Sequence, residues 1–418
     1  MKRIFICLIA FLLLVGCTVS APKNQAGREE PTKYTGVSSA GIWISYSEVN
    51  AMLKSENGFK AEFDKAIQNC KQLNIGNIYL HIRSHCDSLF KSDYFPQNKL
   101  ARGLDYDPFE YAVNACKNSG IKIHAWINPY RINAASDDIS ALDNDSPAYK
   151  WLNDDNPDND INVVRCGGIY LNPAESEVRQ LIIDGIRELL SKYIIDGVHF
   201  DDYFYPTTDP EFDKTSYENY CKTAENPIAL DDWRRANVNT LLAGCRAAIK
   251  SIGGERVDFS ISPAASIDKN YTDYYADVKL WVKDGIMDTI IPQLYFGFDY
   301  PNMDYCFDNL LNEWVSVSIT NENVKLAIGL APYKLGTDNE PDTAEWKNGT
   351  DIIARQIKSC TNNGAVAGYV LFSYSSVFSE AEQTQEQLEK IKEVIANCGD
   401  LKLHIQLRKM NISRNWGK

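Results

Sequence analysis

The feature that most constrains the fold is a regular alternation, from Gly41 onward, of short β-rich runs with longer amphipathic runs. The expected strands cover residues 41–46, 77–83, 121–128, 196–201, 256–262, 288–295, 324–331 and 367–373. The expected helices cover residues 60–74, 107–119, 174–193, 229–252, 272–284, 302–318, 344–363 and 380–397. Strands that alternate with helices form a parallel sheet covered by those helices. Eight such units predict an α/β fold, a (β/α)8 TIM barrel with loop insertions on its C-terminal face.

The residues within the strands favour this barrel over an open, doubly wound sheet. No GxGxxG motif follows the first strand, as it would in a dinucleotide-binding sheet. Along 121–128 the odd positions are apolar, whereas the even positions are Lys122, His124, Trp126 and Asn128. A parallel sheet is covered on both faces, so a polar second face fits the interior of a closed barrel.

The polar side chains at the strand ends indicate where chemistry would occur, because barrel active sites lie at the C-terminal ends of the strands. The inward register ends at Ser45, Arg83, Asn128, Asp201, Ser262, Tyr295 and Ser373. The loops beyond add Asp87, Tyr130, Arg131, Asp202, Tyr203, Tyr205, Phe298 and Asp299. The set lacks a pattern of metal ligands, since the first strand has no His-x-His and the chain has no CxxC pair. We therefore expect neither a metal nor a cofactor.

Carboxylates beside aromatic rings are typical of the active site of a glycoside hydrolase, in which two carboxyl groups act on one glycosidic bond. Asp201 is expected to point into the barrel, and Asp202 to occupy the first loop position. The structural alternative for this Asp-Asp pair is a loop cap or an ion pair. A net charge of −13 argues against binding to nucleic acid.

Several motifs resemble one bacterial family. They include HAWINPYR (124–131), YLNPAESEVR (170–179), DGVHFDDYFYP (196–206) and DWRRAN (232–237). Together they are similar to the lipoproteins called glycosyl-hydrolase-like family ten, over nearly all of residues 40–397. The resemblance implies a TIM-barrel glycosidase that acts on bacterial glycans. One branch of the family is similar to hydrolases of peptidoglycan strands that have lost their peptides.

A more distant resemblance is to family-eighteen chitinases. Asp196, Gly197 and Asp201 match their fourth-strand motif, but His199 replaces the middle Asp and Tyr203 stands in place of the acidic Glu. The chitinase acid is therefore missing at its usual position. The acid must be Asp202 or a carboxylate from another loop, such as Asp87, Glu175, Glu177 or Asp299.

These observations lead to a set of expected roles. Asp201 would stabilise or attack the anomeric carbon, Asp202 would be the general acid, and Asp87 is the second candidate acid. We expect hydrogen bonds to substrate from Arg83, Asn128, Arg131, Asn172, Gln293 and Tyr295. We expect Trp126, Tyr130, Tyr203 and Tyr205 to shape the subsites or stack on sugar faces. Structural roles remain open: Arg83 or Arg131 could only pair with Asp201, and Trp126 could fill the barrel.

The N-terminus is predicted to direct export. Lys2 and Arg3 precede an apolar run, residues 4–15, that is too short to span a bilayer and fits a signal peptide. The run ends in a sequence that resembles a lipobox, which implies cleavage before Cys17 and a lipid on its thiol; a chance Cys is the alternative. We expect a signal peptide at 1–16, a flexible tether at 17–36, the barrel at 37–397 and a C-terminal extension at 398–418. The expected product is a monomeric cell-envelope lipoprotein anchored to a membrane by Cys17.

Two long insertions leave the function partly open. Residues 131–170 and 203–230 would lie over the C-terminal face, either as walls of a substrate site or as surface elaborations. The competing functions are a catalytically inert glycan-binding lipoprotein and a glycosidase for a polysaccharide outside the cell wall.

Overall fold

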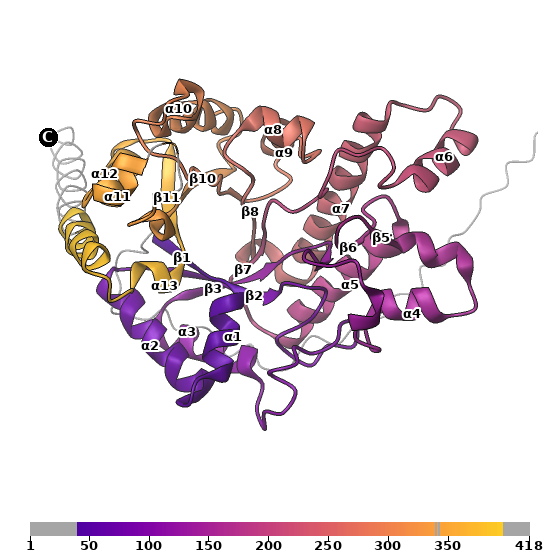
Figure 1. Ribbon diagram of the computed structural model, residues 1–418, viewed down its shortest axis with the longest axis horizontal. Coiled ribbons are helices and arrows are strands. Elements are labelled where there is room, and N and C mark those ends of the chain that lie inside the picture. Colours follow the sequence, from indigo (N-terminus) through magenta and orange to yellow (C-terminus); the bar gives the residue numbers. More distant parts are fainter. Residues whose placement is uncertain (1–39, 339–340, 342, 396–418) are drawn as a thin grey trace, which may run out of the picture. The chain divides into compact units, whose positions relative to one another are not determined.

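Eight parallel strands form a closed barrel (Figure 1). The computed structural model describes residues 40–338, 341 and 343–395; the expected signal peptide, Cys17, the tether and the C-terminal extension lie outside these residues. The barrel strands are β1 (Ala40–Ile44), β2 (Asn77–Arg83), β3 (Lys122–Ile127), β7 (Gly197–Phe200), β8 (Asp258–Ile261), β9 (Thr289–Ile290), β10 (Lys325–Leu330) and β11 (Val366–Phe372). Their order is β1-β11-β10-β9-β8-β7-β3-β2, and every neighbouring pair is parallel. The predicted TIM barrel is confirmed, and each predicted strand overlaps an observed one.

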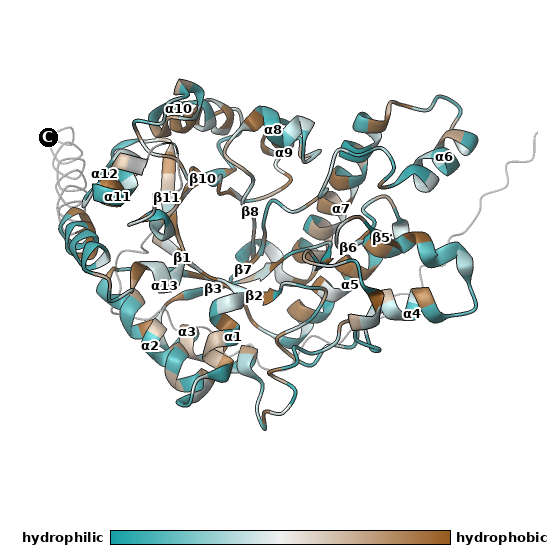
Figure 2. Ribbon diagram, in the orientation of Figure 1, coloured by the Kyte–Doolittle hydropathy of each residue, from teal (hydrophilic) through white to brown (hydrophobic). Residues whose placement is uncertain are grey.

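Helices pack around the barrel. They include α2 (Gly58–Gln72), α3 (Pro108–Ser119), α5 (Ser176–Lys192), α7 (Leu230–Gly253), α8 (Ile267–Thr272), α9 (Val278–Asp284), α10 (Phe307–Ser318), α11 (Thr343–Asn348) and α12 (Ile352–Asn362). Helix α2 and helix α10 alternate hydrophilic and hydrophobic residues along their ribbons, as helices with one face on the barrel do (Figure 2). None of the helices in the described ranges is long and apolar enough to cross a bilayer.

Helix α1 (Tyr46–Lys54) was not predicted. The chain leaves β1 at Ile44 and enters this helix through a capping box. In it the Ser45 side chain faces the backbone N–H of Glu48, and the Glu48 carboxylate accepts a hydrogen bond from the backbone N–H of Ser45. The Glu48 carboxylate also accepts hydrogen bonds from the Ser373 hydroxyl (2.8 Å) and from the Ser375 amide (2.6 Å). It therefore joins the end of β1 to the end of β11, where the barrel closes.

The two insertions contain regular structure that was not predicted. Residues 131–170 hold α4 (Pro147–Asn153) and most of a three-stranded antiparallel sheet of β4 (Arg131–Asn133), β6 (Ile169–Leu171) and β5 (Val163–Arg165). Residues 203–230 hold α6 (Lys214–Thr223). Strands this short give little periodic signal, so the sequence shows only a polar tract.

The barrel interior is aromatic and polar. Trp43, Tyr79 and Trp126 belong to a small inner cluster, separate from the large apolar core between strands and helices. His199 lies among them and is fully buried; its Nε2 accepts a hydrogen bond from Trp43 Nε1 at 3.0 Å. Burial holds the pKa of His199 well below its usual value, so the ring is neutral.

Gly197 is a closely packed position in this interior. A Cβ at this position would lie 2.1 Å from His124 Nδ1 and 2.9 Å from the Asp258 carbonyl oxygen. We therefore expect Gly197→Ala to lower the free energy of unfolding by about 1–3 kcal/mol, as overpacked cores do. The check is denaturant unfolding beside Gly103→Ala, whose added methyl would meet nothing within 4 Å. Equal stability of the two variants would contradict the expected steric conflict.

Candidate active site

Asp201 lies immediately after β7, at the C-terminal mouth of the barrel, and is buried. Trp126 Nε1 on β3 donates to its Oδ2 at 3.1 Å. The Asn128 side chain, just beyond β3, donates to both carboxylate oxygens at 3.2 Å. The inward periodicity of β3 places both donors on the lumen side. Trp126 and Asn128 thus fix the orientation of Asp201.

Asp201 and Asp202 interact electrostatically. Burial raises the pKa of Asp201, while Arg131 and the hydrogen bonds from Trp126 and Asn128 oppose the rise. Burial raises the pKa of half-buried Asp202 to about 7, and the charge of Asp201 adds to the effect. Near neutral pH this pair can hold one ionised and one protonated carboxyl group. Such a pair can supply an acid and a stabilising anion at once.

Arg131 stands beside the pair. Its backbone N–H donates to Asn128 Oδ1 at 2.9 Å, and its Nε donates to the Ser84 carbonyl at 3.0 Å. The guanidinium lies 5.0 Å from the ring centre of Tyr203 and 5.6 Å from that of Tyr46. These rings are 54% and 39% exposed, so they present aromatic faces at the mouth.

More aromatic rings come from the strand ends β9, β10 and β11. Tyr295 stacks on Phe372 with ring centres 5.9 Å apart, and Tyr333 meets Tyr295 edge-on at 5.8 Å. Burial raises the pKa of Tyr295, and the charges of Tyr333 and Asp202 add to the effect, which couples these rings to the carboxyl pair. Gln293, on the loop after β9, donates to the Ser262 carbonyl at 2.9 Å and hydrogen-bonds Asp202. Polar and aromatic groups therefore surround Asp201 and Asp202.

Asp87 occupies a different setting. Its Oδ1 accepts hydrogen bonds from the amides of Ser84 and His85, both at 3.1 Å, and its Oδ2 accepts one from Asn98 at 3.4 Å. The carboxylate thus caps the loop after β2. It also lines a pocket of about 400 Å³ between this loop and the 131–170 insertion, to which Ile132 contributes. The insertion is therefore a wall of this pocket.

The inward register expected for Arg83 is corrected. The pairing of β2 with β3 shifts, so that His81 lies opposite Trp126 but Arg83 lies opposite Ile127. Such a bulge moves the following side chain to the other face of the sheet. The Arg83 guanidinium stacks over Phe95, 3.6 Å from the ring centre, and lies beside Gly185 of α5. Arg83 is buried on the helix side and does not reach Asp201.

Three other expected substrate contacts also have structural positions. Tyr130 and Tyr205 are each 1% exposed and belong to the large apolar core. The amide of Asn172 donates to the Ile161 carbonyl (2.9 Å) and the Ser216 hydroxyl (3.0 Å), and its Oδ1 accepts from the Ala174 amide. All three are buried away from the mouth, so the contact roles expected for them are corrected.

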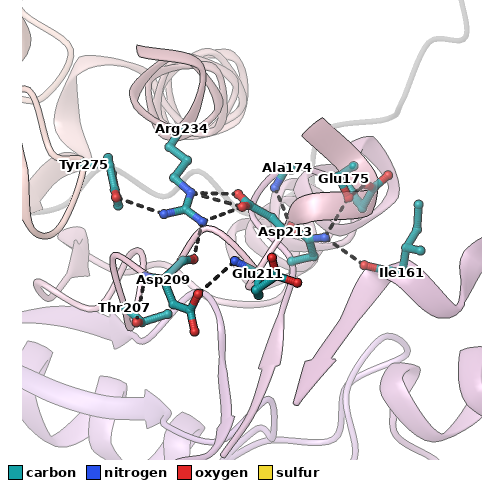
Figure 3. Close-up of polar contacts among 11 residues, drawn as sticks. Ile161, Ala174, Glu175, Thr207, Asp209, Glu211, Asp213, Arg234 and Tyr275 are labelled. Carbon is teal, nitrogen blue, oxygen red and sulfur yellow. Dashed lines mark hydrogen bonds and ion pairs between the residues drawn. The ribbon is translucent and has the colours of Figure 1, made fainter. Parts of the chain in front are cut away.

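A buried ion pair anchors the loop that follows Asp202. Figure 3 shows Arg234 of α7 directed toward Asp213, Tyr275 and the backbone of Asp209. The Arg234 and Asp213 side chains are completely buried. This pair ties the 203–230 insertion to α7 and so supports the segment that carries Tyr203.

Sequence reasoning did not select Tyr46, His85 or Tyr333 as site residues. The His85 Nδ1 is 2.8 Å from the Ser84 hydroxyl, and its ring meets Tyr46 edge-on at 4.8 Å. Tyr46 directly follows Ser45, the last inward position of the predicted strand 41–46, and was assigned to its outward face. Within the described residues, no three His, Cys, Asp or Glu side chains form a group that could hold a metal ion.

Comparison with known proteins gives consistent matches. The family model described as Glycosyl hydrolase-like 10 matches residues 39–348. Glycosyl hydrolase YngK of Bacillus subtilis (strain 168) is 32% identical over 361 residues, which cover 79% of this chain and 67% of the relative. Glycosyl hydrolase DigH of Escherichia coli O6:H1 is 27% identical over 430 residues, which cover 91% of this chain and 94% of the relative.

A solved structure resembles the barrel. It is the PgaB (BpsB) glycoside hydrolase domain from Bordetella bronchiseptica, with a TM-score of 0.58 and 13% sequence identity. The match covers 86% of this chain and 99% of that domain. This likeness bears on the fold alone.

Proposed function

Because this chain belongs to the glycosyl hydrolase-like 10 family, we propose that it is a glycoside hydrolase that cleaves the glycan strands of bacterial peptidoglycan. The observation that carries the proposal is the carboxyl pair at the barrel mouth, in which the pKa of Asp202 is raised to about 7 beside Asp201. The aromatic rings of Tyr46, Tyr203 and Tyr333 offer faces for sugar rings. The resemblance of the motifs to hydrolases of peptide-free strands supports peptidoglycan as the polymer.

The chemistry follows from the different states of the two carboxyl groups. Asp202 donates its proton to the glycosidic oxygen as the bond from that oxygen to the anomeric carbon breaks. The Asp201 carboxylate stabilises the positive charge that develops at the anomeric carbon. Water then adds to this carbon and returns a proton to Asp202. We expect Arg131 and Gln293 to contact substrate hydroxyl or acetamido groups.

We also propose that Cys17 carries a lipid that anchors the enzyme in the cell envelope, close to this polymer. The support is the lipobox-like end of the apolar N-terminal run. Acyl chains contribute about 0.8 kcal/mol per buried methylene, so more than one chain gives stable anchoring. Cys17→Ser should release the protein from the membrane fraction of cells.

Release of reducing ends from a purified polymer tests the function directly. The protein is incubated with peptide-free glycan strands, intact peptidoglycan and starch, beside a variant that carries both Asp201→Asn and Asp202→Asn. We expect the wild-type protein to release new reducing ends from the glycan strands and the double variant to release none. Release from starch alone would indicate a different polysaccharide. Binding to the strands without any release would indicate an inert glycan-binding protein.

Trp126→Phe tests how Asp201 is tuned. The substitution removes the donor to Oδ2 and leaves a ring that can still stack on His81, which lies 3.8 Å away. Hydrogen bonds to charged groups contribute about 1.5–3 kcal/mol, so the pKa of Asp201 should rise by about one unit or more. Asp201 must be ionised to act. The acidic limb of the kcat/KM profile should therefore move to higher pH by a similar amount.

Trp43→Phe is the matched control for this shift. Trp43 also donates an indole hydrogen bond within the barrel, but its acceptor is His199. The acidic limb of the kcat/KM profile of Trp43→Phe should stay at the wild-type position. An unshifted limb in Trp126→Phe, or the same shift in both variants, would contradict the assigned role of Trp126.

A further inference from the structure

A second pocket, of about 450 Å³, lies among α5, α6 and α7. Its lining contains none of the residues placed above at the barrel mouth. Two motifs noted in the sequence meet there: Glu175 and Arg179 come from YLNPAESEVR, and Trp233 and Asn237 come from DWRRAN. A volume of this size falls in the range of about 300–1,000 Å³ typical of small-ligand sites.

One side of the pocket is aromatic. Trp233 stacks on Tyr220 with ring centres 5.7 Å apart and an angle of 29° between the planes. Tyr217 supports Trp233 from a ring centre 5.2 Å away. Tyr220 and Trp233 both line the pocket, beside the exposed side chain of Ile228. Aromatic faces of this kind pack against the C–H faces of sugar rings.

The polar groups of the pocket are held in place. Glu175 Oε1 accepts a hydrogen bond from the Ser216 hydroxyl at 2.5 Å, and Figure 3 shows Glu175 among the polar contacts at the start of α5. Arg179 Nη1 donates to the carbonyl oxygens of Pro173 (2.9 Å) and Ala174 (2.7 Å). These contacts fix a carboxylate and a guanidinium at the pocket without using all their hydrogen-bonding capacity.

Asn237 is the group that points to a ligand. Its side chain is 9% exposed, and its Oδ1 accepts from Arg179 at 3.2 Å. Its Nδ2 has no hydrogen-bond partner among the residues that the structure describes. A buried amide N–H without a partner lowers the stability of the fold by about 1–3 kcal/mol, so such a group needs an explanation, and binding of a ligand is one.

We propose that this pocket is a second glycan-binding site, which holds an N-acetylated sugar unit of the polymer outside the catalytic mouth. Tyr220, backed by the buried ring of Trp233, packs against the pyranose, and Asn237 Nδ2 donates to the acetamido carbonyl. Glu175 accepts from a sugar hydroxyl, and Arg179 donates to another. The choice of an N-acetylated sugar rests on the proposed function. The presence of a sugar site rests on the aromatic and polar groups of the pocket itself.

Filling the pocket tests this site. Ala236 is exposed on α7 and lines the pocket, so Ala236→Trp should occupy it without removing an internal contact. Ala247→Trp is the matched control, because Ala247 is exposed on the same helix, about 16 Å further along, and is not part of the lining. Both variants are made in the full chain with Asp202→Asn, so that sugars are bound but not cleaved.

Calorimetric titration with a hexamer of N-acetylglucosamine counts the bound oligosaccharides. We expect two per chain in the Asp202→Asn protein and in the Ala247→Trp control, and one in Ala236→Trp. With active enzyme, Ala236→Trp should raise KM for peptide-free strands at least fivefold and leave kcat/KM for a nitrophenyl chitobioside within twofold. Unchanged stoichiometry and KM in Ala236→Trp would overturn the second site.

A second pocket-filling variant covers the case in which Ala236→Trp is unstable. Thr240→Tyr fills the same pocket from the next turn of α7, so it replaces Ala236→Trp if that variant melts early. Its retention of both bound oligosaccharides would equally overturn the site. If the wild type cleaves no glycan, the function proposed above fails, but loss of one bound oligosaccharide on filling the pocket still supports the second site.

Discussion

Asp202→Asn should lower kcat for glycan cleavage by about 10²–10⁴-fold, the usual contribution of a general acid. The Asn side chain cannot donate a proton to the leaving oxygen, although it keeps the size of Asp202 and its contact with Gln293. The wild-type rate should fall as pH rises through about 7, because the acid form of Asp202 is then lost. This alkaline limb should be absent from the residual activity of the variant.

The same substitution should stabilise the protein at alkaline pH. The ordinary pKa of this carboxyl is 3.8, and in the folded protein it is about 7, so the folded state holds the proton more tightly. Its contribution to stability is complete below about pH 4 and is lost as pH rises toward 7. Since Asn cannot ionise, Asp202→Asn should melt above the wild type at about pH 8. The difference in Tm should vanish near pH 4.

Asp87→Asn distinguishes the two candidate acids. Asp87 caps the loop after β2 through two backbone amides, so its loss should mainly affect the pocket beside that loop. We expect kcat within about tenfold of the wild type and an alkaline limb that stays near pH 7. If Asp87→Asn abolishes turnover while Asp202→Asn remains active with its limb intact, the assignment is reversed.

The barrel could be predicted because its signal is repeated along the chain. Each β-rich run, such as 77–83, is followed by an amphipathic helix, and right-handed parallel connections leave few other arrangements. Glu48 shows what a local reading can miss: with Ser45 it forms a capping box that starts α1, and it also reaches the distant Ser373. The second contact depends on closure of the barrel and has no local signal.

The site was predictable where the strand period held and not where it broke. Trp126 lies on β3, and Asn128 and Asp201 directly follow the regular strands β3 and β7; their side chains meet. Arg83 follows a bulge, and the resulting change of face depends on the pairing with β3 rather than on the β2 sequence. The burial of Tyr205 depends on how the 203–230 insertion folds back onto Arg234, 5.2 Å from its ring centre.

Asp201→Asn should lower kcat by about 10³-fold, since it removes the anion that faces the developing positive charge. Asn is nearly the same size, so the barrel should remain folded. Oδ2 accepts hydrogen bonds from both Trp126 and Asn128, so an amide oxygen in its place keeps both donors. The amide NH2 in place of Oδ1 cannot accept the second bond from Asn128.

The variant should also change the titration of its neighbour, and this separates an electrostatic role from a merely structural one. Loss of the Asp201 charge removes one cause of the raised pKa of Asp202, while burial remains. The alkaline limb of the residual activity should therefore move below pH 7.

Asp258→Asn is the control, because this carboxylate begins β8 at the opposite end of the barrel and accepts a hydrogen bond from Thr289. Asp258→Asn should leave both kcat and the alkaline limb of the pH profile unchanged. Full activity of Asp201→Asn would remove Asp201 from the mechanism, because a group that stabilises charge at the anomeric carbon cannot be replaced by its neutral isostere without cost. The same loss in Asp258→Asn would also contradict the assignment, because the effect would then not be specific to the barrel mouth.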